Sequence, residues 1–353
     1  MPSQLLTASV ASPIDITADV SAEEWDGFVR GFGGSNGYHL WAWRTIFEQA
    51  FGHETVYLAA RRDGGLAGIL PLVIFRSRVF GSFAVSLPFI DGGGVCAYDA
   101  EVARHLVDRA RAVAAERGLS HVEMRHEARI FPALPSREHK VGMRMPLETD
   151  TKRAWDALDR KVRNQVRKAE KSGLTTRSAG IELVDAFYSV FAVNMRDLGT
   201  PVYSKRLFES VLTTLPNSSR VFLVEKGSTV VGGAIGIMFR DTFTVPWASS
   251  LREYRADCPN NLLYWRMFEH AIEAGVRTFD FGRSTPGEGT FHFKQQWGAA
   301  PLPLYWEYVM VRGGSPPELS PSNPRYKAAI ETWKRLPLPI TRLLGPHIVR
   351  SIP

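Results

Sequence analysis

The chain has 353 residues, of which 44% are hydrophobic and 22% charged, a composition typical of a globular protein rather than a disordered or fibrous one. At about one domain per 150 residues, this length predicts two domains. Lys and Arg outnumber Asp and Glu by 43 to 36, a formal net charge of +7, which excludes an acid-coated protein and permits polyanionic partners.

The cysteines and the apolar runs indicate the compartment. Cys96 and Cys258 lie far apart, so they predict neither a disulfide framework nor a cysteine-based metal site. No basic residue precedes Arg30, and no apolar run approaches the ~20 residues of a spanning helix. We therefore expect a cytoplasmic protein whose membrane association, if any, is peripheral.

In the first half, a capping box at Ser21–Glu24 predicts the start of a helix. Alternation of apolar and polar residues then predicts a hairpin, and three successive glycines at 92–94 predict a loop. The expected elements are, in order, helices after 21 and over 40–51, strands over 54–61, 66–75 and 83–88, a helix over 102–117 and a strand over 121–125.

The second half repeats this order. The expected elements are helices over 154–171 and 183–197, strands over 220–225, 230–239 and 242–248, a helix over 260–274 and a strand over 278–281. The pattern predicts an α+β fold (α/β layered) of two similar domains, residues 21–145 and 146–310. An arm (1–20) precedes them, and a proline-rich basic tail (311–353) follows and is expected to wrap the surface.

A cationic stripe is the strongest charge feature. Arg160, Arg163, Arg167 and Lys171 recur every three or four residues and so share one helix face. Most such runs are solvated helix faces. Like charges at this spacing repel each other, so an anion-binding face is the other interpretation, and both remain open.

A second candidate follows the strand that ends near Phe281. The triplet Asp280–Gly282 occurs in protein kinases, but no other kinase motif is present. What remains is a glycine-rich loop that carries Arg283 and Lys294 between apolar residues. Because isolated cations are costly when partly buried, we favour a functional site over two solvated surface charges.

Other motifs are weak or absent. Residues 62–67 match a short pyrophosphate-binding pattern of CoA-dependent acetyltransferases, but they join two strands, so we interpret them as a structural turn. The equivalent segment 251–261 lies between a strand and a helix but has no glycine. No metal-binding or nucleophile motif appears, which favours catalysis by positioning and charge stabilisation. Trp247 and Tyr254 are candidates for a pocket wall, with core packing as the alternative.

Several blocks, taken in order, resemble one family. They are 68–72 (GILPL), 86–89 (SLPF), the glycines 92–94, 163–171 (RNQVRKAEK), 199–203 (GTPVY), 261–265 (NLLYW), 279–283 (FDFGR) and 293–298 (FKQQWG). Over about residues 25–310 the chain is similar to the FemAB-type nonribosomal aminoacyl/peptidyltransferases, in particular the branch associated with the exosortase/PEP-CTERM system. The resemblance implies two tandem GNAT-like N-acyltransferase domains.

The resemblance also implies a reaction: transfer of an amino acid or acyl group from an activated donor, such as aminoacyl-tRNA, to an amine of a peptidoglycan- or exopolysaccharide-related precursor. No cofactor would be required. Lys294 and Arg283 would stabilise charge in catalysis. The substrate-binding residues that it implies, together with the two aromatic candidates above, are Arg163, Arg167, Lys168, Trp247, Tyr254, Asn261 and Tyr203.

The sequence departs from this family in one respect. It has no long heptad segment to form the coiled-coil arm that some Fem enzymes use for tRNA, which leaves the donor open. A CoA-dependent N-acyltransferase is therefore the second hypothesis. A non-catalytic binding subunit of an envelope assembly is the third.

Overall fold

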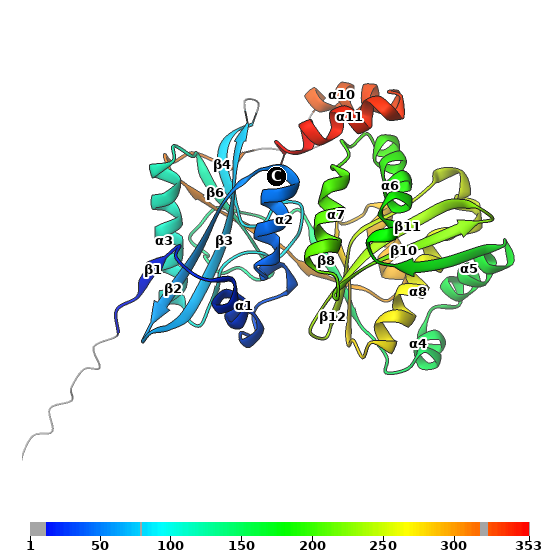
Figure 1. Cartoon of the computed structure of the whole chain (residues 1–353), viewed down its shortest axis with the longest axis horizontal. Coiled ribbons are helices and arrows are strands. Elements are labelled where there is room, and N and C mark those ends of the chain that lie inside the picture. The colour runs from blue at the N-terminus through cyan, green and yellow to red at the C-terminus, as the bar shows by residue number, and fades with distance from the viewer. Residues whose placement is uncertain (1–11, 78–79, 318–323, 353) are drawn as a thin grey trace, which may run out of the picture.

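The computed structural model describes residues 12–77, 80–317 and 324–352. Its strands form two sheets, each flanked by helices, in two lobes that lie side by side (Figure 1). The first sheet has the order β1 (Asp15–Thr17), β2 (Glu54–Arg62), β3 (Gly65–Ser77), β4 (Gly81–Val85), β6 (His121–His126), β15 (Tyr305–Met310), β7 (Ser136–Arg137), with β5 (Cys96–Ala97) paired to β3. The second has the order β14 (Ala300–Pro303), β8 (Val141–Pro146), β13 (Thr278–Ser284), β12 (Thr242–Ser250), β11 (Thr229–Phe239), β10 (Ser219–Lys226), β9 (Leu174–Ala179).

The repeated order of elements expected from the sequence is present, but its second copy begins with the helix after residue 183 instead of the expected helix over 154–171, and it includes a helix over 205–214 that was not predicted. In the first lobe, two helices, a hairpin and a strand are followed by a helix and a parallel strand; these helices are α1 (Ala22–Gly31), α2 (Ala42–Phe51) and α3 (Ala100–Glu116). Their counterparts in the second lobe are α6 (Val184–Leu198), α7 (Lys205–Thr214) and α8 (Pro259–Glu273). The capping box also forms, since the Ser21 hydroxyl accepts from the Glu24 N–H and the Glu24 carboxylate accepts from the Ser21 N–H.

The two lobes exchange strands. β8 leaves the first lobe and pairs antiparallel with β13 of the second sheet, while β15 returns and pairs antiparallel with β6 of the first. The expected boundary at 145/146 therefore falls inside β8, and the last strand of the expected second domain lies in the first sheet. We call the first sheet with α1–α3 the first domain. The second domain is the second sheet with α4 (Thr151–Ala157), α5 (Arg160–Lys171), α6–α8 and α9 (Gly289–Gln296).

One apolar core joins the domains. Trp43 and Phe47 of α2 and Phe208 and Val211 of α7 belong to a single buried cluster, and α2 packs against α7. A second cluster fills the other face of the second sheet beneath α4, α5 and α8. The shared core fixes how the two sheets face each other, which determines the shape of the cleft between them.

A central parallel pair in each sheet separates after a few residues. β4 pairs with β6 only at Ala84 and Val85. β12 pairs with β13 over Thr242–Thr244 and then diverges from it. Beyond these residues neither strand pair continues as a regular ladder.

Four segments differ from expectation. The expected helix over 154–171 is two helices, α4 and α5, because the backbone is extended at Leu158 and Asp159 caps a new helix start. Within the expected arm, Asp15–Thr17 forms β1 on the edge of β2, and residues 1–11 lie outside the described part. The expected glycine-rich loop closes into a helix, α9 (Gly289–Gln296). The expected tail forms two helices, α10 (Pro324–Lys334) and α11 (Leu338–Val349). Proline is tolerated in a first helical turn, and α11 also contains Pro346 in its interior. Among the described residues, no helix combines the length and the apolar character needed to cross a membrane.

Candidate functional site

A cavity of about 330 Å³ lies between the two domains. The first domain contributes residues 33–38 and Glu127. The second contributes Arg144, Thr242, Thr244, Asp280 and the hairpin 237–241. Since no single domain could form this cavity, it depends on the shared core and the exchanged strands.

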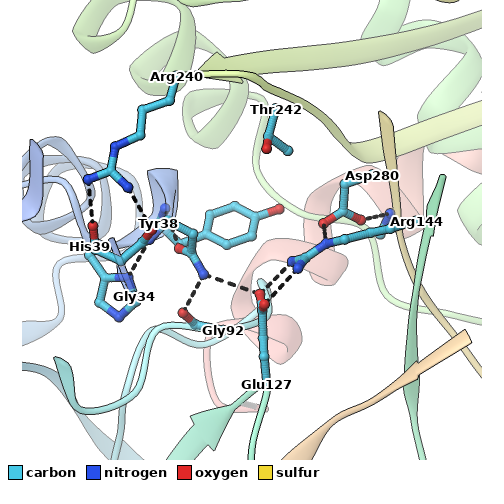
Figure 2. Close-up of polar contacts among 12 residues, drawn as sticks. Gly34, Tyr38, His39, Gly92, Glu127, Arg144, Arg240, Thr242 and Asp280 are labelled. Carbon is cyan, nitrogen blue, oxygen red and sulfur yellow. Dashed lines mark hydrogen bonds and ion pairs between the residues drawn. The ribbon is translucent and has the colours of Figure 1, made fainter. Parts of the chain in front are cut away.

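A charged triad lies at one side of the cavity (Figure 2). Arg144 on β8 donates from Nε to Asp280 at 2.7 Å and from Nη1 to Glu127 at 2.6 Å. It also donates from Nη2 to the second oxygen of Glu127, so this contact between the domains is bidentate. Bidentate guanidinium–carboxylate pairs fix geometry as well as charge. The triad therefore holds the domains in register at the cavity.

The Asp280 carboxyl is the buried acid of this triad. Its Oδ1 accepts from the Gly282 N–H at 2.7 Å, and its side chain is 8% exposed. Burial raises the pKa of Asp280 above its ordinary value, although Arg144 opposes the shift. Burial alone would lower the pKa of Arg144, but its pairing with Glu127 and Asp280 outweighs burial and raises it. Asp280 is thus an ionisable carboxyl with increased proton affinity, facing a cavity.

Tyr38 extends toward Asp280 from the first domain (Figure 2). Burial, followed by the charges of Asp280 and Asp91, raises the pKa of Tyr38 well above its ordinary value. The hydroxyl therefore stays protonated and can serve as a hydrogen-bond donor. Asn36 fixes this segment, because its Oδ1 accepts from the Tyr38 N–H at 2.9 Å and its Nδ2 donates to the Gly92 carbonyl at 2.8 Å.

Two glycines allow these close approaches. A Cβ on Gly92, whose φ is +79°, would lie 2.7 Å from both the Asn36 amide nitrogen and a Glu127 oxygen. A Cβ on Gly37 would lie 2.8 Å from Cβ of Phe239 in the second domain. Larger residues at either position would push the two domains apart at the cavity.

Arg240 clamps the opposite side of the cavity. It occupies the tight turn between β11 and β12 with a φ of +52°, an uncommon conformation for a residue other than glycine. From there its Nη2 donates to the carbonyls of Arg30 at 2.9 Å and Phe32 at 3.0 Å, and to that of Val29. Its Nη1 donates to the Ser35 carbonyl at 3.3 Å. The side chain thus caps the end of α1 and positions the glycine-rich segment 33–37.

The two residues expected to act in catalysis are adjacent. Lys294 on α9 donates from Nζ to the carbonyls of Gly282 at 3.1 Å and Arg283 at 2.8 Å. Burial lowers the pKa of Lys294 to about 8, against the opposing attraction of Asp280 and Asp91. Arg283 donates to Asp91 of the first domain at 3.0 Å, and Asp91 raises its pKa. The Arg283 side chain remains 32% exposed, so an anion can reach it.

Tyr203 lies close to this pair, whereas Trp247 is part of the core. Burial raises the pKa of Tyr203, and the nearby Arg283 opposes the shift. The Tyr203 ring packs edge-on against Phe89 of the first domain, with centroids 5.2 Å apart. Trp247 is 5% exposed and packs against Phe208. The alternative of core packing therefore describes Trp247 better than a pocket wall.

The other expected substrate-binding residues lie elsewhere. Asn261 is buried, and its Nδ2 donates to Gln165 at 3.1 Å, joining α8 to α5. Tyr254 packs beside Lys226, outside the cavity. The α5 residues among them are Arg163, which is half-buried, and Arg167 and Lys168, which are exposed.

The distance between the cationic residues of α5 and the pair Lys294–Arg283 follows from the order of strands in the second sheet. α5 contacts β9 at one edge of the second sheet, while α9 contacts β13 and β8 near the other. Four strand spacings of ~4.8 Å separate β9 from β13, which places the cationic stripe roughly 20 Å from Lys294. A ligand that contacts both must be large.

Several cavity residues were missed by sequence reasoning, namely Asn36, Tyr38, Glu127, Arg144, Arg240 and Asp280 as a site acid. Only segment 33–37 (GGSNG) carried a signal, a cluster of glycines before a helix. The others come from five separate parts of the chain, and only the packing of the two domains brings them together.

The comparisons with known proteins agree with this architecture. Residues 157–295 match the acetyltransferase (GNAT) domain family. The second domain is of the GNAT acetyltransferase type. A search of curated proteins gave no match.

Solved structures extend the similarity to both domains. The crystal structure of FemX superposes with a TM-score of 0.66 at 15% identity, covering 84% of this chain and 98% of FemX. A tandem GNAT protein from the clavulanic acid biosynthesis pathway gives 0.53 at 13% identity, covering 86% of this chain and all of that one. The C-terminal domain of a putative lysylphosphatidylglycerol synthetase from Agrobacterium fabrum gives 0.56 at 13% identity, covering 83% and 92%. The expected fold of two tandem GNAT-like domains is confirmed.

Proposed function

We propose that this protein transfers an aminoacyl group from an activated ester to an amine, with the reaction taking place at the cavity between the domains. The observation that carries the proposal is the charge of the cavity: three carboxylates, Glu127, Asp241 and Asp280, face it with only two guanidinium groups. An excess of carboxylate suits a substrate that enters as an ammonium ion. Both an aminoacyl group and an acceptor amine carry one.

The acidic and hydroxyl groups fit the proton transfers of such a reaction. The acceptor ammonium ion first releases one proton to solvent. The neutral nitrogen then forms a bond to the acyl carbon, and the ester C–O bond breaks. Asp280 accepts the proton that the nitrogen loses, which its raised pKa favours. Tyr38, held in its protonated form, donates to the departing oxygen. The proton balance closes when Asp280 returns a proton to Tyr38.

The cations beside the cavity suit a phosphorylated donor. Lys294 donates to two strand carbonyls, while the Arg283 side chain remains partly exposed. We propose that Arg283 contacts a donor phosphate or the developing oxyanion and that Lys294 holds the Arg283 backbone in place. The acyl end of the donor would lie in the cavity, against Thr242, Thr244 and Asp280 at the paired start of β12 and β13.

The N-terminal ends of the two helices beside the diverging strand pairs favour a tRNA ester over a CoA thioester as the donor. α3 begins at Asp99, whose carboxylate caps the N–H groups of Glu101 and Val102 and pairs with Arg62, so these N–H groups are not free to bind a pyrophosphate. α8 begins with Cys258 and Pro259, and proline offers no N–H. Residues 62–67 form the turn between β2 and β3, as their interpretation as a structural turn predicts.

The cationic stripe supports the same donor. Arg160, Arg167 and Lys168 are exposed on α5, and roughly 20 Å separates this face from Lys294. An aminoacyl-tRNA is large enough to contact both, with its phosphates on α5 and its ester in the cavity. By the resemblance to the FemAB type, we propose an amine of a cell-envelope precursor as the acceptor.

Binding measurements test the proposal without knowledge of the acceptor. We would titrate the purified protein with aminoacyl-tRNA, deacylated tRNA and acetyl-CoA at two salt concentrations. We expect tighter binding of the charged tRNA, with an affinity that falls steeply with salt. Saturable acetyl-CoA binding with negligible tRNA affinity would instead favour the CoA-dependent enzyme, which the GNAT family match makes the second candidate. No binding to any of the three would favour a non-catalytic subunit.

A further inference from the structure

The C-terminal helix α11 docks through one narrow face. Thr341, Gly345 and Val349, spaced four residues apart, are buried. The contact is close, since a Cβ on Gly345 would lie 2.8 Å from the backbone nitrogen of Val202. This face fixes the helix on the second domain, and Figure 1 shows α11 at the outer edge of the molecule, beside α6.

The outer face of α11 is apolar. Ile340, Leu343, Leu344 and Ile348 are 41%, 68%, 44% and 38% exposed. Their spacing places them on one stripe that borders the docked face near Thr341 and that also contains the exposed His347. Nine large hydrophobic side chains are exposed among the described residues, and these four account for almost half. Single exposed apolar residues are normal, but a contiguous patch marks an interaction surface.

Three exposed arginines lie at or near the helix. Arg335 precedes it, Arg342 lies on it with its guanidinium 5.1 Å from the ring centroid of Tyr188 on α6, and Arg350 directly follows it. Residues 311–353 contain seven Lys or Arg and only two Glu. An apolar stripe beside arginines is typical of helices that lie in the interface of a bilayer with anionic lipids. A second copy of this helix would bring the same positive charges together.

The geometry suits a helix that lies in the membrane plane. At 1.5 Å per residue, its 12 residues span about 18 Å, less than the ~30 Å of the hydrocarbon layer. The helix is also tied to both domains: Gly345 packs on Val202, and a guanidinium nitrogen of Arg350 lies 3.7 Å from the place of a Cβ on Gly52. Docking through α11 would therefore orient the whole two-domain unit.

We propose that α11 is a membrane-docking helix that inserts Ile340, Leu343, Leu344 and Ile348 into the surface of an anionic phospholipid bilayer. The proposal rests on this surface alone and does not depend on the transfer reaction. It can therefore hold even where the donor assignment fails.

Vesicle flotation tests the proposal with the full-length chain. The probes are vesicles of pure phosphatidylcholine and vesicles with 30% phosphatidylglycerol, a composition chosen for roughly physiological surface charge. We expect binding to the anionic vesicles that weakens with salt, and much weaker binding to the neutral ones. Leu343→Glu combined with Leu344→Glu should reduce the partition coefficient by at least about tenfold, because two leucine side chains that would be buried in the bilayer are lost.

Two further variants separate the apolar contribution to vesicle binding from the electrostatic one. Leu302→Glu, on β14 and 39% exposed, makes the same chemical change on another surface and should leave vesicle binding unchanged. Arg335→Gln should weaken binding to anionic vesicles only, by about fivefold. Equal melting temperatures would show that the variants fold.

Three results would overturn the inference. One is failure of the wild-type protein to bind anionic vesicles. Another is equal loss of binding in the Leu302→Glu variant and the double α11 variant. The third is a wild-type dimer that the double α11 variant converts to a monomer, which would make a second copy the occupant of this face.

Discussion

Arg144 is the residue whose removal should most disturb the contact between the domains. Replacing it with methionine keeps much of the side-chain volume but leaves Glu127 and Asp280 without their shared cation. Breaking a fully buried ion pair costs about 3–5 kcal/mol. Because the Arg144 side chain is 28% exposed, water compensates part of this loss, and we expect a decrease of about 2–3 kcal/mol in the free energy of unfolding.

The assay is urea unfolding followed by tryptophan fluorescence, with Arg153→Met as the control. Arg153 pairs with Asp150 at the surface with its side chain 72% exposed, so its loss should cost less than about 1 kcal/mol. Combining Arg144→Met with Glu127→Gln should cost less than Arg144→Met alone, because one uncompensated carboxylate is then neutral.

The decrease in unfolding free energy caused by Arg144→Met should also depend on pH. Burial already raises the pKa of Asp280, and the loss of Arg144 removes the main opposing charge. The folded variant then binds a proton that the unfolded chain releases, so its deficit should shrink as the pH falls from 7 to 5. A deficit no larger than that of Arg153→Met, or one that does not change with pH, would refute the reasoning.

Three further predictions concern the cavity and the stripe. Burial lowers the pKa of Lys294 to about 8, while the pKa of a lysine in the unfolded chain is near 10.5. The wild type should therefore gain stability relative to Lys294→Met as the pH rises from 8 to 10.5. A difference in unfolding free energy that stays constant over this range would contradict the prediction. Arg240→Met removes the cap of α1 and should speed amide hydrogen exchange over residues 29–37 by at least about tenfold, with no change at α8, measured by mass spectrometry. Arg167→Gln with Lys168→Gln should reduce the slope of log affinity for tRNA against log salt by about 1.5 at unchanged melting temperature, and an unchanged slope would remove α5 from the tRNA site.

The sequence predicts the fold because local signals are strong in this chain. The capping box at Ser21, the hairpin turn at Asp63–Gly64 and the alternating strands each specify an element by themselves. Their order repeats, and the repeat predicts two similar domains. The exchange of β8 and β15 was not predictable in this way, because short-range patterns carry no information on which sheet edge a strand will join.

The candidate site was predictable only in part. Arg283 and Lys294 are near in sequence, so apolar flanks indicated a shared environment, and the structure places them together. Glu127, Arg144 and Tyr38 meet through tertiary packing, and no spacing in the sequence relates them. Asn261 was expected to bind substrate because it lies in one of the blocks that resemble the family. In the structure it pairs with Gln165 in the interior instead.

The most direct test of the central claim is the preference of the protein for charged over deacylated tRNA, measured in the wild type and in Asp280→Asn. The account predicts that the wild type binds the aminoacyl form at least about tenfold more tightly, because the cavity carboxylates hold the ammonium group. It further predicts that Asp280→Asn loses this preference while its affinity for deacylated tRNA stays unchanged. Equal binding of both forms by the wild type, or a preference that survives the substitution, would contradict aminoacyl transfer at this cavity.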